Sequence, residues 1–245
     1  MSAPADPLRS VSAATVGPWL PLESNPDLLN EVGAKWGMPA NFSFHEILST
    51  SPDLLALVPQ PVEACILLFP CTDNIYAARR KQQPSLTAPS TASPLLFLQQ
   101  HSEFGNACGT IAAIHAIANT CKSASSSSPI GSFAKANAGL PAAAVGHSLL
   151  SNADLKSSSD ATAQSSAAQT ACPARDGAPL DHHFAAFVTH DSRCFELDGT
   201  KPYPVDHGPV SPASFLADVA SIVRTQFMAH DPDCIEFSLI ALCSS

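Results

Sequence analysis

Hydrophobic and polar residues alternate along the chain in blocks with two different periods. Helical spacing of apolar positions predicts helices over 26–36, 51–57, 72–83, 130–136, 142–150 and 212–227. In the helix over 72–83, we expect Arg79, Arg80 and Lys81 to lie at an exposed end. Short apolar runs bounded by turn residues predict strands over 42–47, 62–69, 183–188, 194–197 and 235–242. Helices before and after a group of antiparallel strands favour a layered α+β domain.

In one block, a polar loop runs directly into a helical pattern near a cysteine. The apolar residues of 111–118 fall on one helical face, with Asn106 as the predicted N-cap and Asn119 as the predicted stop. This spacing places Cys108 in the first helical turn, where free N–H groups and the helix dipole favour an anion such as a thiolate. A buried, inert cysteine is nevertheless the commonest kind. A role for Cys108 as a catalytic nucleophile therefore requires a nearby base.

A predicted hairpin later in the chain supplies a candidate base and a group to orient it. His183 begins the first strand and Asp198 follows the second, so a tight hairpin makes the two side chains neighbours. The imidazole can then take the thiol proton, while Asp198 holds the tautomer. Because successive strand residues face opposite sides, only one of His182 and His183 can point toward Cys108. The residues alone also allow the other interpretation, a structural cysteine, a surface histidine and an Asp-Gly turn.

Composition and charge exclude several classes of protein. The net charge of −9 argues against a nucleic-acid partner and suits a basic one, and no apolar run is long enough for a membrane span. The eight cysteines include no CxxC pair and no zinc-type spacing, which favours reduced thiols in a cytoplasmic or nuclear protein without metal or cofactor. We expect a disordered tail over 1–16 and one domain over 17–245, with a flexible Ala- and Ser-rich loop over about 152–179.

Residues 104–119 closely resemble the active-site signature of ubiquitin carboxyl-terminal hydrolases, in the small papain-like subfamily typified by the isozymes L1 and L3. Blocks similar to other motifs of the family occur in the family's order at 19–26, 52–59 and 67–70, before this signature, and at 183–208 and 237–242, after it. The resemblance implies a papain-like α+β fold, with a six- or seven-stranded antiparallel sheet between helical lobes. It also implies a thiol-dependent deubiquitinase that cleaves peptide, amide or ester bonds after the C-terminal glycine of ubiquitin and releases small adducts.

The resemblance also assigns roles to individual residues. By motif position Cys108 is the nucleophile that forms the acyl-enzyme, His183 the general base and acid, and Asp198 the group that orients the imidazole. His182 takes the position of a hydrophobic residue in relatives, so it is not expected to be catalytic.

The oxyanion loop departs from the family pattern. The family's glutamine lies six residues before the nucleophile, where this chain has Ser102, which indicates a loop that is longer by two residues. We therefore assign the oxyanion donor to Gln100, with Gln99 as the alternative and the backbone N–H of Cys108 as the second donor. Loss of such a donor typically slows an enzyme about 100- to 1000-fold.

The partner is expected to be ubiquitin, with NEDD8 as the alternative. The residues that resemble the family's ubiquitin-packing segment are Leu20, Pro21, Leu22, Glu23 and Asn25. In the family a crossover loop arches over the active site and limits the size of the leaving group, and residues 152–179 take that place here. A NEDD8-preferring hydrolase and a ubiquitin-binding protein with weak catalysis remain alternatives, and we expect a monomer.

Overall fold

One antiparallel sheet forms the centre of the molecule. The computed structural model describes residues 18–245 except 92–93, 122–123 and 174–179, so the tail predicted over 1–16 lies outside the described residues. Within the described part, six strands pair antiparallel in the order β1-β6-β2-β3-β4-β5. They are β1 (Phe42–Ile47), β2 (Val62–Pro70), β3 (His182–His190), β4 (Arg193–Leu197), β5 (Val205–Pro209) and β6 (Ser238–Ser244). The predicted hairpin is confirmed as β3–β4, whereas β5 was not predicted.

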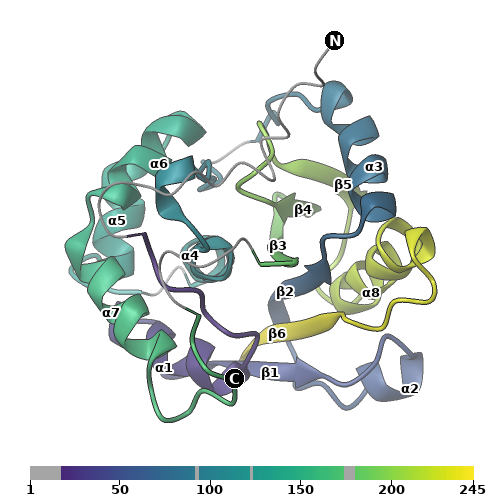
Figure 1. Ribbon diagram of the computed structural model, residues 1–245, viewed down its shortest axis with the longest axis horizontal. Helices are drawn as coiled ribbons and strands as arrows, with labels where there is room; N and C mark the ends of the chain where they lie inside the picture. The colour runs from purple at the N-terminus through teal and green to yellow at the C-terminus, as the bar shows by residue number, and fades with distance from the viewer. Residues whose placement is uncertain (1–17, 92–93, 122–123, 174–179) are drawn as a thin grey trace.

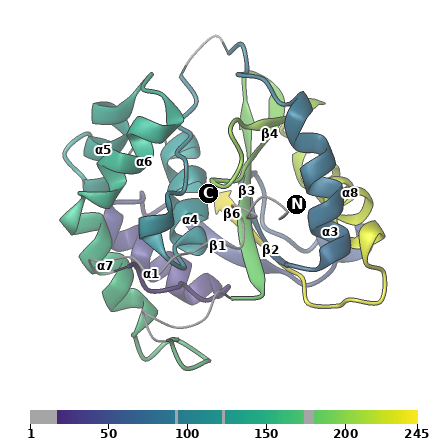
Figure 2. The ribbon, with the colours of Figure 1, turned by 45° about the horizontal axis from the view of Figure 1, so that its top comes forward.

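Helices cover both faces of this sheet (Figure 1 and Figure 2). One face carries α1 (Pro26–Trp36), α4 (Cys108–Thr120), α5 (Pro129–Asn137), α6 (Ala142–Leu150) and α7 (Ala153–Ala163). The other carries α3 (Asp73–Gln82) and α8 (Phe215–Gln226), with the short α2 (Pro52–Leu55) packed near α8. Short 3₁₀ turns occupy Gln83–Ser85, Ser102–Phe104 and Met228–His230. The predicted layered α+β arrangement is confirmed.

Successive residues of the central strand β2 face two separate cores. Ala64 and Ile66 pack in the core on the α4 side of the sheet. Cys65, Leu67 and Phe69 pack in the core beneath α8. Both faces of the strand are therefore buried, which explains why its sequence reads as an almost continuous apolar run.

Local capping explains where α1 begins and ends. The side chain of Asn25 accepts a hydrogen bond of 2.9 Å from the N–H of Asp27, and Pro26 is the first helical residue. Gly37 ends the helix in the left-handed region at φ 89°, which glycine adopts without strain. These are the boundaries that the sequence predicts.

The prediction of a flexible loop over 152–179 is wrong for its first part, which forms α7. This helix attaches to the domain through hydroxyl groups as well as apolar contacts. Ser158 Oγ accepts a 2.9 Å hydrogen bond from Trp36 Nε1, and Ser159 Oγ lies 2.8 Å from Thr110 Oγ1 on α4. Serines at packed positions leave no hydrophobic period in the sequence, so the sequence pattern predicts a loop. Among the described helices, none has the length and hydropathy needed to cross a bilayer.

Candidate active site

Cys108 is the first residue of α4 and is 9% exposed. Ala107 occupies the N-cap position, so the prediction of Asn106 as the cap is wrong by one residue, and no side chain caps this end of the helix. The thiol thus lies at an uncapped helix N-terminus, where the local dipole favours an anion. Gly109 follows, and a Cβ there would lie 3.1 Å from the carbonyl oxygen of Leu22, tighter than ordinary contact. Glycine at this position lets the N-terminal segment pack over the first turn of α4.

Cys108 opens into a cleft of about 450 Å³. The cleft is lined by residues from the segments 21–24, 168–173 and 180–184, together with Cys108 and Asn106. Segments far apart in the chain therefore meet above the thiol. The crossover region supplies one wall, as predicted, although part of that region (174–179) lies outside the described residues.

His183 lies beside the thiol and is 6% exposed. Its Nε2 donates a 2.7 Å hydrogen bond to Asp198 Oδ1, and the imidazole also donates a hydrogen bond to the sulfur of Cys108. Burial disfavours the charged imidazole, but the Asp198 carboxylate and the Cys108 sulfur outweigh it and raise the pKa of His183 to about 10. The neighbouring His182 also lines the cleft, but its Nε2 lies 3.3 Å from Glu236 Oε2. The structure thus brings Cys108, His183 and Asp198 together.

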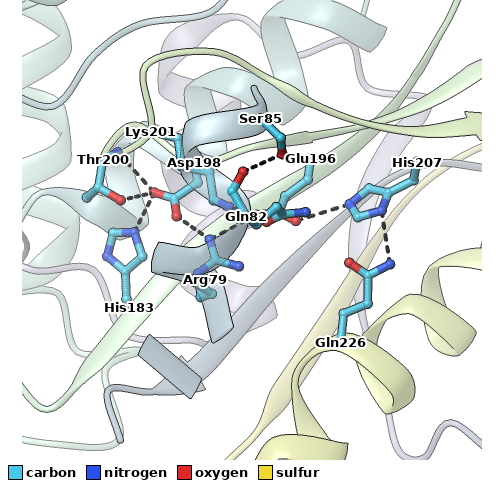
Figure 3. A network of polar contacts seen from close by, with 10 residues as sticks. All are labelled: Arg79, Gln82, Ser85, His183, Glu196, Asp198, Thr200, Lys201, His207 and Gln226. Atoms are coloured by element: carbon cyan, nitrogen blue, oxygen red, sulfur yellow. Dashed lines mark hydrogen bonds and ion pairs between the residues drawn. The ribbon is translucent and has the colours of Figure 1, made fainter. Parts of the chain in front are cut away.

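Asp198 is held by donors on both carboxylate oxygens (Figure 3). Besides His183, Oδ1 accepts hydrogen bonds from Thr200, 3.0 Å from its backbone N and 2.7 Å from its Oγ1. Oδ2 pairs with the guanidinium of Arg79. Burial opposes ionisation, but His183, Arg79 and Lys201 hold the pKa of Asp198 well below its usual range. The carboxylate is therefore ionised and has a fixed direction.

Arg79 was predicted at an exposed helix end, and this prediction is wrong because its side chain is 6% exposed. The guanidinium lies 4.7 Å from the ring centre of Phe69 and 4.9 Å from that of Phe227, and it donates a 2.9 Å hydrogen bond to Glu196 Oε1. A signal for this burial exists in the sequence. Tyr76 precedes Arg79 by three residues, so the two share one face of α3.

The two candidate glutamines lie on different sides of their loop. The backbone N–H of Gln100 donates to Gly199 O at 2.7 Å, next to Asp198, whereas that of Gln99 donates to Ala142 O at the start of α6. The Gln100 amide nitrogen donates to Gly105 O at 3.2 Å, and its Oε1 is buried with no hydrogen-bond partner among the described residues. Gln100 is thus the glutamine placed on the Asp198 side of the loop.

Two of the five residues predicted to contact the partner make hydrogen bonds within the chain. Leu20 is 3% exposed and its backbone N–H donates to Asp160 Oδ1 at 2.8 Å. The side chain of Asn25 caps α1 and donates to Ala167 O, so for both residues a partner contact stays a prediction. The other three candidates, Pro21, Leu22 and Glu23, line the cleft.

Glu23 connects this segment to the opposite wall of the cleft. Its Oε2 accepts hydrogen bonds from the backbone N–H groups of Gln169, at 2.9 Å, and Thr170, at 3.4 Å. Cys172 lines the same cleft as Cys108, a proximity that no spacing in the sequence indicates. Among the residues that the structure describes, no group of three or more His, Cys, Asp or Glu side chains is arranged to hold a metal ion.

Comparisons with known proteins agree with this geometry. Residues 19–229 match the family described as ubiquitin carboxyl-terminal hydrolase, family 1. A ubiquitin carboxyl-terminal hydrolase of Drosophila melanogaster is 33% identical over 229 residues, which cover 93% of this chain and 98% of that protein. The isozyme L1 of Monodelphis domestica is 33% identical over 225 residues, covering 91% and 97%.

The fold is similar to that of solved catalytic domains. The catalytic domain of Trichinella spiralis UCH37, crystallised with ubiquitin vinyl methyl ester, aligns with a TM-score of 0.69 at 19% identity. The alignment covers 94% of this chain and 96% of that one. This likeness confirms the predicted papain-like fold.

Proposed function

Since the chain belongs to family 1 of the ubiquitin carboxyl-terminal hydrolases, we propose that it is a thiol-dependent deubiquitinase. It cleaves peptide, amide or ester bonds after the C-terminal glycine of ubiquitin and releases small adducts. The observation that carries this proposal is the position of Cys108, at a helix N-terminus, in a cleft and beside the His183–Asp198 pair. A nucleophile, a base and a group that orients the base are the parts that thiol hydrolysis requires.

The proposed reaction proceeds through an acyl-enzyme. The Cys108 thiolate attacks the carbonyl carbon of the terminal glycine, and the His183 imidazolium gives its proton to the leaving amine or alkoxide as the scissile bond breaks. Water then attacks the thioester while His183 accepts one of its protons. Loss of the sulfur restores the thiolate and releases the ubiquitin carboxylic acid, which gives its proton to solvent. Asp198 supports the protonated state of His183 in both halves.

Gln100 and the backbone N–H of Cys108 are the proposed donors to the oxyanion. An amide nitrogen carries two N–H groups, and one of them in Gln100 is used by Gly105 O. The second is the group that would serve the oxyanion. The hydrogen bond from the first N–H group to Gly105 O also favours the alternative function, a ubiquitin-binding protein with weak catalysis.

Ubiquitin is the proposed partner because its C-terminal tail is basic and the cleft presents acidic residues. Glu23 and Asp181 both line it, and the whole chain carries a net charge of −9. Preference for NEDD8, a monomeric state and a cytoplasmic or nuclear location stay predictions from the sequence.

Turnover of fluorogenic C-terminal amides of ubiquitin and NEDD8 tests the proposal. We expect the ubiquitin substrate to be hydrolysed with the higher kcat/KM, and Cys108→Ala to abolish turnover while Cys172→Ala, in the same cleft, retains it. Faster turnover of the NEDD8 substrate would favour the NEDD8-preferring hydrolase. Binding of ubiquitin without measurable turnover would favour the weak-catalysis alternative.

A further inference from the structure

We propose that Arg79 and Thr200 are positioning residues that fix the Asp198 carboxylate so that its Oδ1 faces Nε2 of His183. The inference rests on the proposed function of Cys108 and His183, because it concerns the group that orients their proton transfer. Both residues act through Asp198, and neither is assigned a contact with substrate.

The donors around Asp198 occupy both carboxylate oxygens. Oδ2 takes the guanidinium of Arg79, while Oδ1 accepts from His183 and from the backbone N–H and hydroxyl of Thr200. Rotation of the carboxylate would break hydrogen bonds on both oxygens at once. The hydrogen bonds from Arg79 and Thr200 therefore hold the Oδ1 lone pairs in the direction of His183.

Arg79 is itself fixed, which allows it to act as a rigid support (Figure 3). Phe69 and Phe227 contact its guanidinium, and Glu196 accepts a second hydrogen bond at 2.9 Å. Both contacts come from Nη2 of Arg79, whose two N–H bonds have fixed directions in the guanidinium plane, whereas a lysine ammonium rotates freely and acts as a point charge. An arginine at this position therefore has a geometric role that lysine cannot supply.

The surrounding charges balance. Arg79 and Lys201 are positive, Asp198 and Glu196 are negative, and Lys201 Nζ lies 3.9 Å from Glu196 Oε1. Other titratable groups that interact with this cluster are His207, 3.1 Å from Glu196, and His183, Tyr76, Cys71, His115 and Cys194. Because the opposite charges offset one another, Asp198 stays ionised in a buried site without recruiting a proton.

A purely structural role is the competing explanation, since the same contacts join α3 to the end of β4. The test therefore needs a readout that stability alone does not change. Two measurements on Arg79→Lys, Thr200→Val and the wild type supply it. They are the kcat and KM for a fluorogenic ubiquitin amide, and the pH dependence of Cys108 alkylation by iodoacetamide, read by mass spectrometry of the Cys108 peptide.

We expect Arg79→Lys to lower kcat about tenfold or more, with KM within about twofold of wild type, because a misdirected base affects chemistry and not binding. Without a fixed Asp198, the His183 imidazolium should release its proton more readily. The change in the Cys108 alkylation rate at alkaline pH should therefore occur at a pH lower by about one unit. Thr200→Val should lower kcat about threefold and should also shift the alkaline change in the alkylation rate to lower pH. Arg193→Gln, which removes an arginine from the exposed pair with Asp206, should match wild type.

Folded Arg79→Lys and Thr200→Val proteins with wild-type kcat and a wild-type alkylation profile would overturn the proposal, even if their melting temperatures fell. If Arg79→Lys does not fold, Thr200→Val decides, because it removes one hydroxyl and keeps the side-chain shape. The alkylation profile needs no ubiquitin. Absence of turnover in the wild type would therefore contradict the proposed function, while the profile still tests the positioning role.

Discussion

The two sides of the site around Cys108 are held by different kinds of contact. Behind His183, Asp198 and Arg79 form a buried network in which both side chains are at most 6% exposed. On the crossover side, Glu23 binds the backbone at 169–170 through hydrogen bonds that are exposed to solvent. A buried charged network is expensive to disrupt, whereas an exposed hydrogen bond contributes about 0.5–1.5 kcal/mol at most. The molecule therefore fixes its catalytic geometry firmly and holds the cover of its cleft loosely.

The largest effect should follow from Asp198→Asn, on the rigid side. An asparagine keeps the shape but cannot stabilise the imidazolium, and a comparable change in a serine-protease triad lowers kcat by about 10⁴-fold. We expect kcat on a fluorogenic ubiquitin amide to fall about 10³- to 10⁴-fold, with KM little changed. Asp206→Asn is the matched control, because Asp206 pairs with Arg193 at the surface. A loss below tenfold in Asp198→Asn would show that the network is not needed for the chemistry.

Gln100→Ala should give the next largest loss, about 100- to 1000-fold in kcat, because it removes a proposed oxyanion donor. Gln99→Ala is the matched control, since its backbone is bonded to the α6 side of the loop. The same assay compares both variants. Near wild-type activity of Gln100→Ala together with a loss in Gln99→Ala would reverse the assignment.

The rigid network should also make stability depend on pH. The pKa of His183 is raised from its ordinary 6.5 to about 10 by the Asp198 carboxylate and Cys108, against the opposing effect of burial. A raised pKa contributes stability that is fully present below pH 6.5 and is lost as pH rises toward 10. The difference in free energy of unfolding between wild type and His183→Gln, from urea titrations under reducing conditions, should therefore shrink across this window. A difference independent of pH would contradict the ion pair.

The smallest effect should come from Glu23→Gln, on the loosely held side. The glutamine introduced at position 23 keeps a hydrogen-bond acceptor but removes the charge. The free energy of local opening of residues 164–173 should then fall by less than about 1 kcal/mol, and their limited proteolysis should accelerate only about two- to fivefold. We expect kcat on a small amide to stay within about twofold. Glu46→Gln, at an exposed position of β1, is the control. A tenfold loss of kcat in Glu23→Gln would show that the two sides of the site are coupled.

The parts of the fold that follow apolar periodicity could be predicted from the sequence. The run that forms β2, the capped helix α1 and the β3–β4 hairpin all bury hydrophobic side chains at regular spacing. The hairpin also brings His183 next to Asp198, as its strand lengths predict. The family and the papain-like fold, inferred from several motifs in one order, are confirmed as well.

Features that depend on buried polar groups could not be predicted in this way. Helix α7 packs through hydrogen bonds of Ser158 and Ser159, and serines at packed positions leave no hydrophobic pattern. Arg79 was placed at the surface because arginine is rarely buried unless it is paired, and its partners lie more than a hundred residues away in the chain. The cap of α4 also shifted from Asn106 to Ala107, because the helix begins only at Cys108 itself.

A ubiquitin probe with a C-terminal electrophile tests the central claim most directly, since it requires both recognition of ubiquitin and a reactive Cys108. We predict a single covalent adduct, one ubiquitin per chain, with the modified residue identified as Cys108 by peptide mass spectrometry. Cys172→Ala should form it at the wild-type rate, and Cys108→Ala should not form it at all. No adduct with the wild type, or an adduct that survives Cys108→Ala, would contradict the assignment.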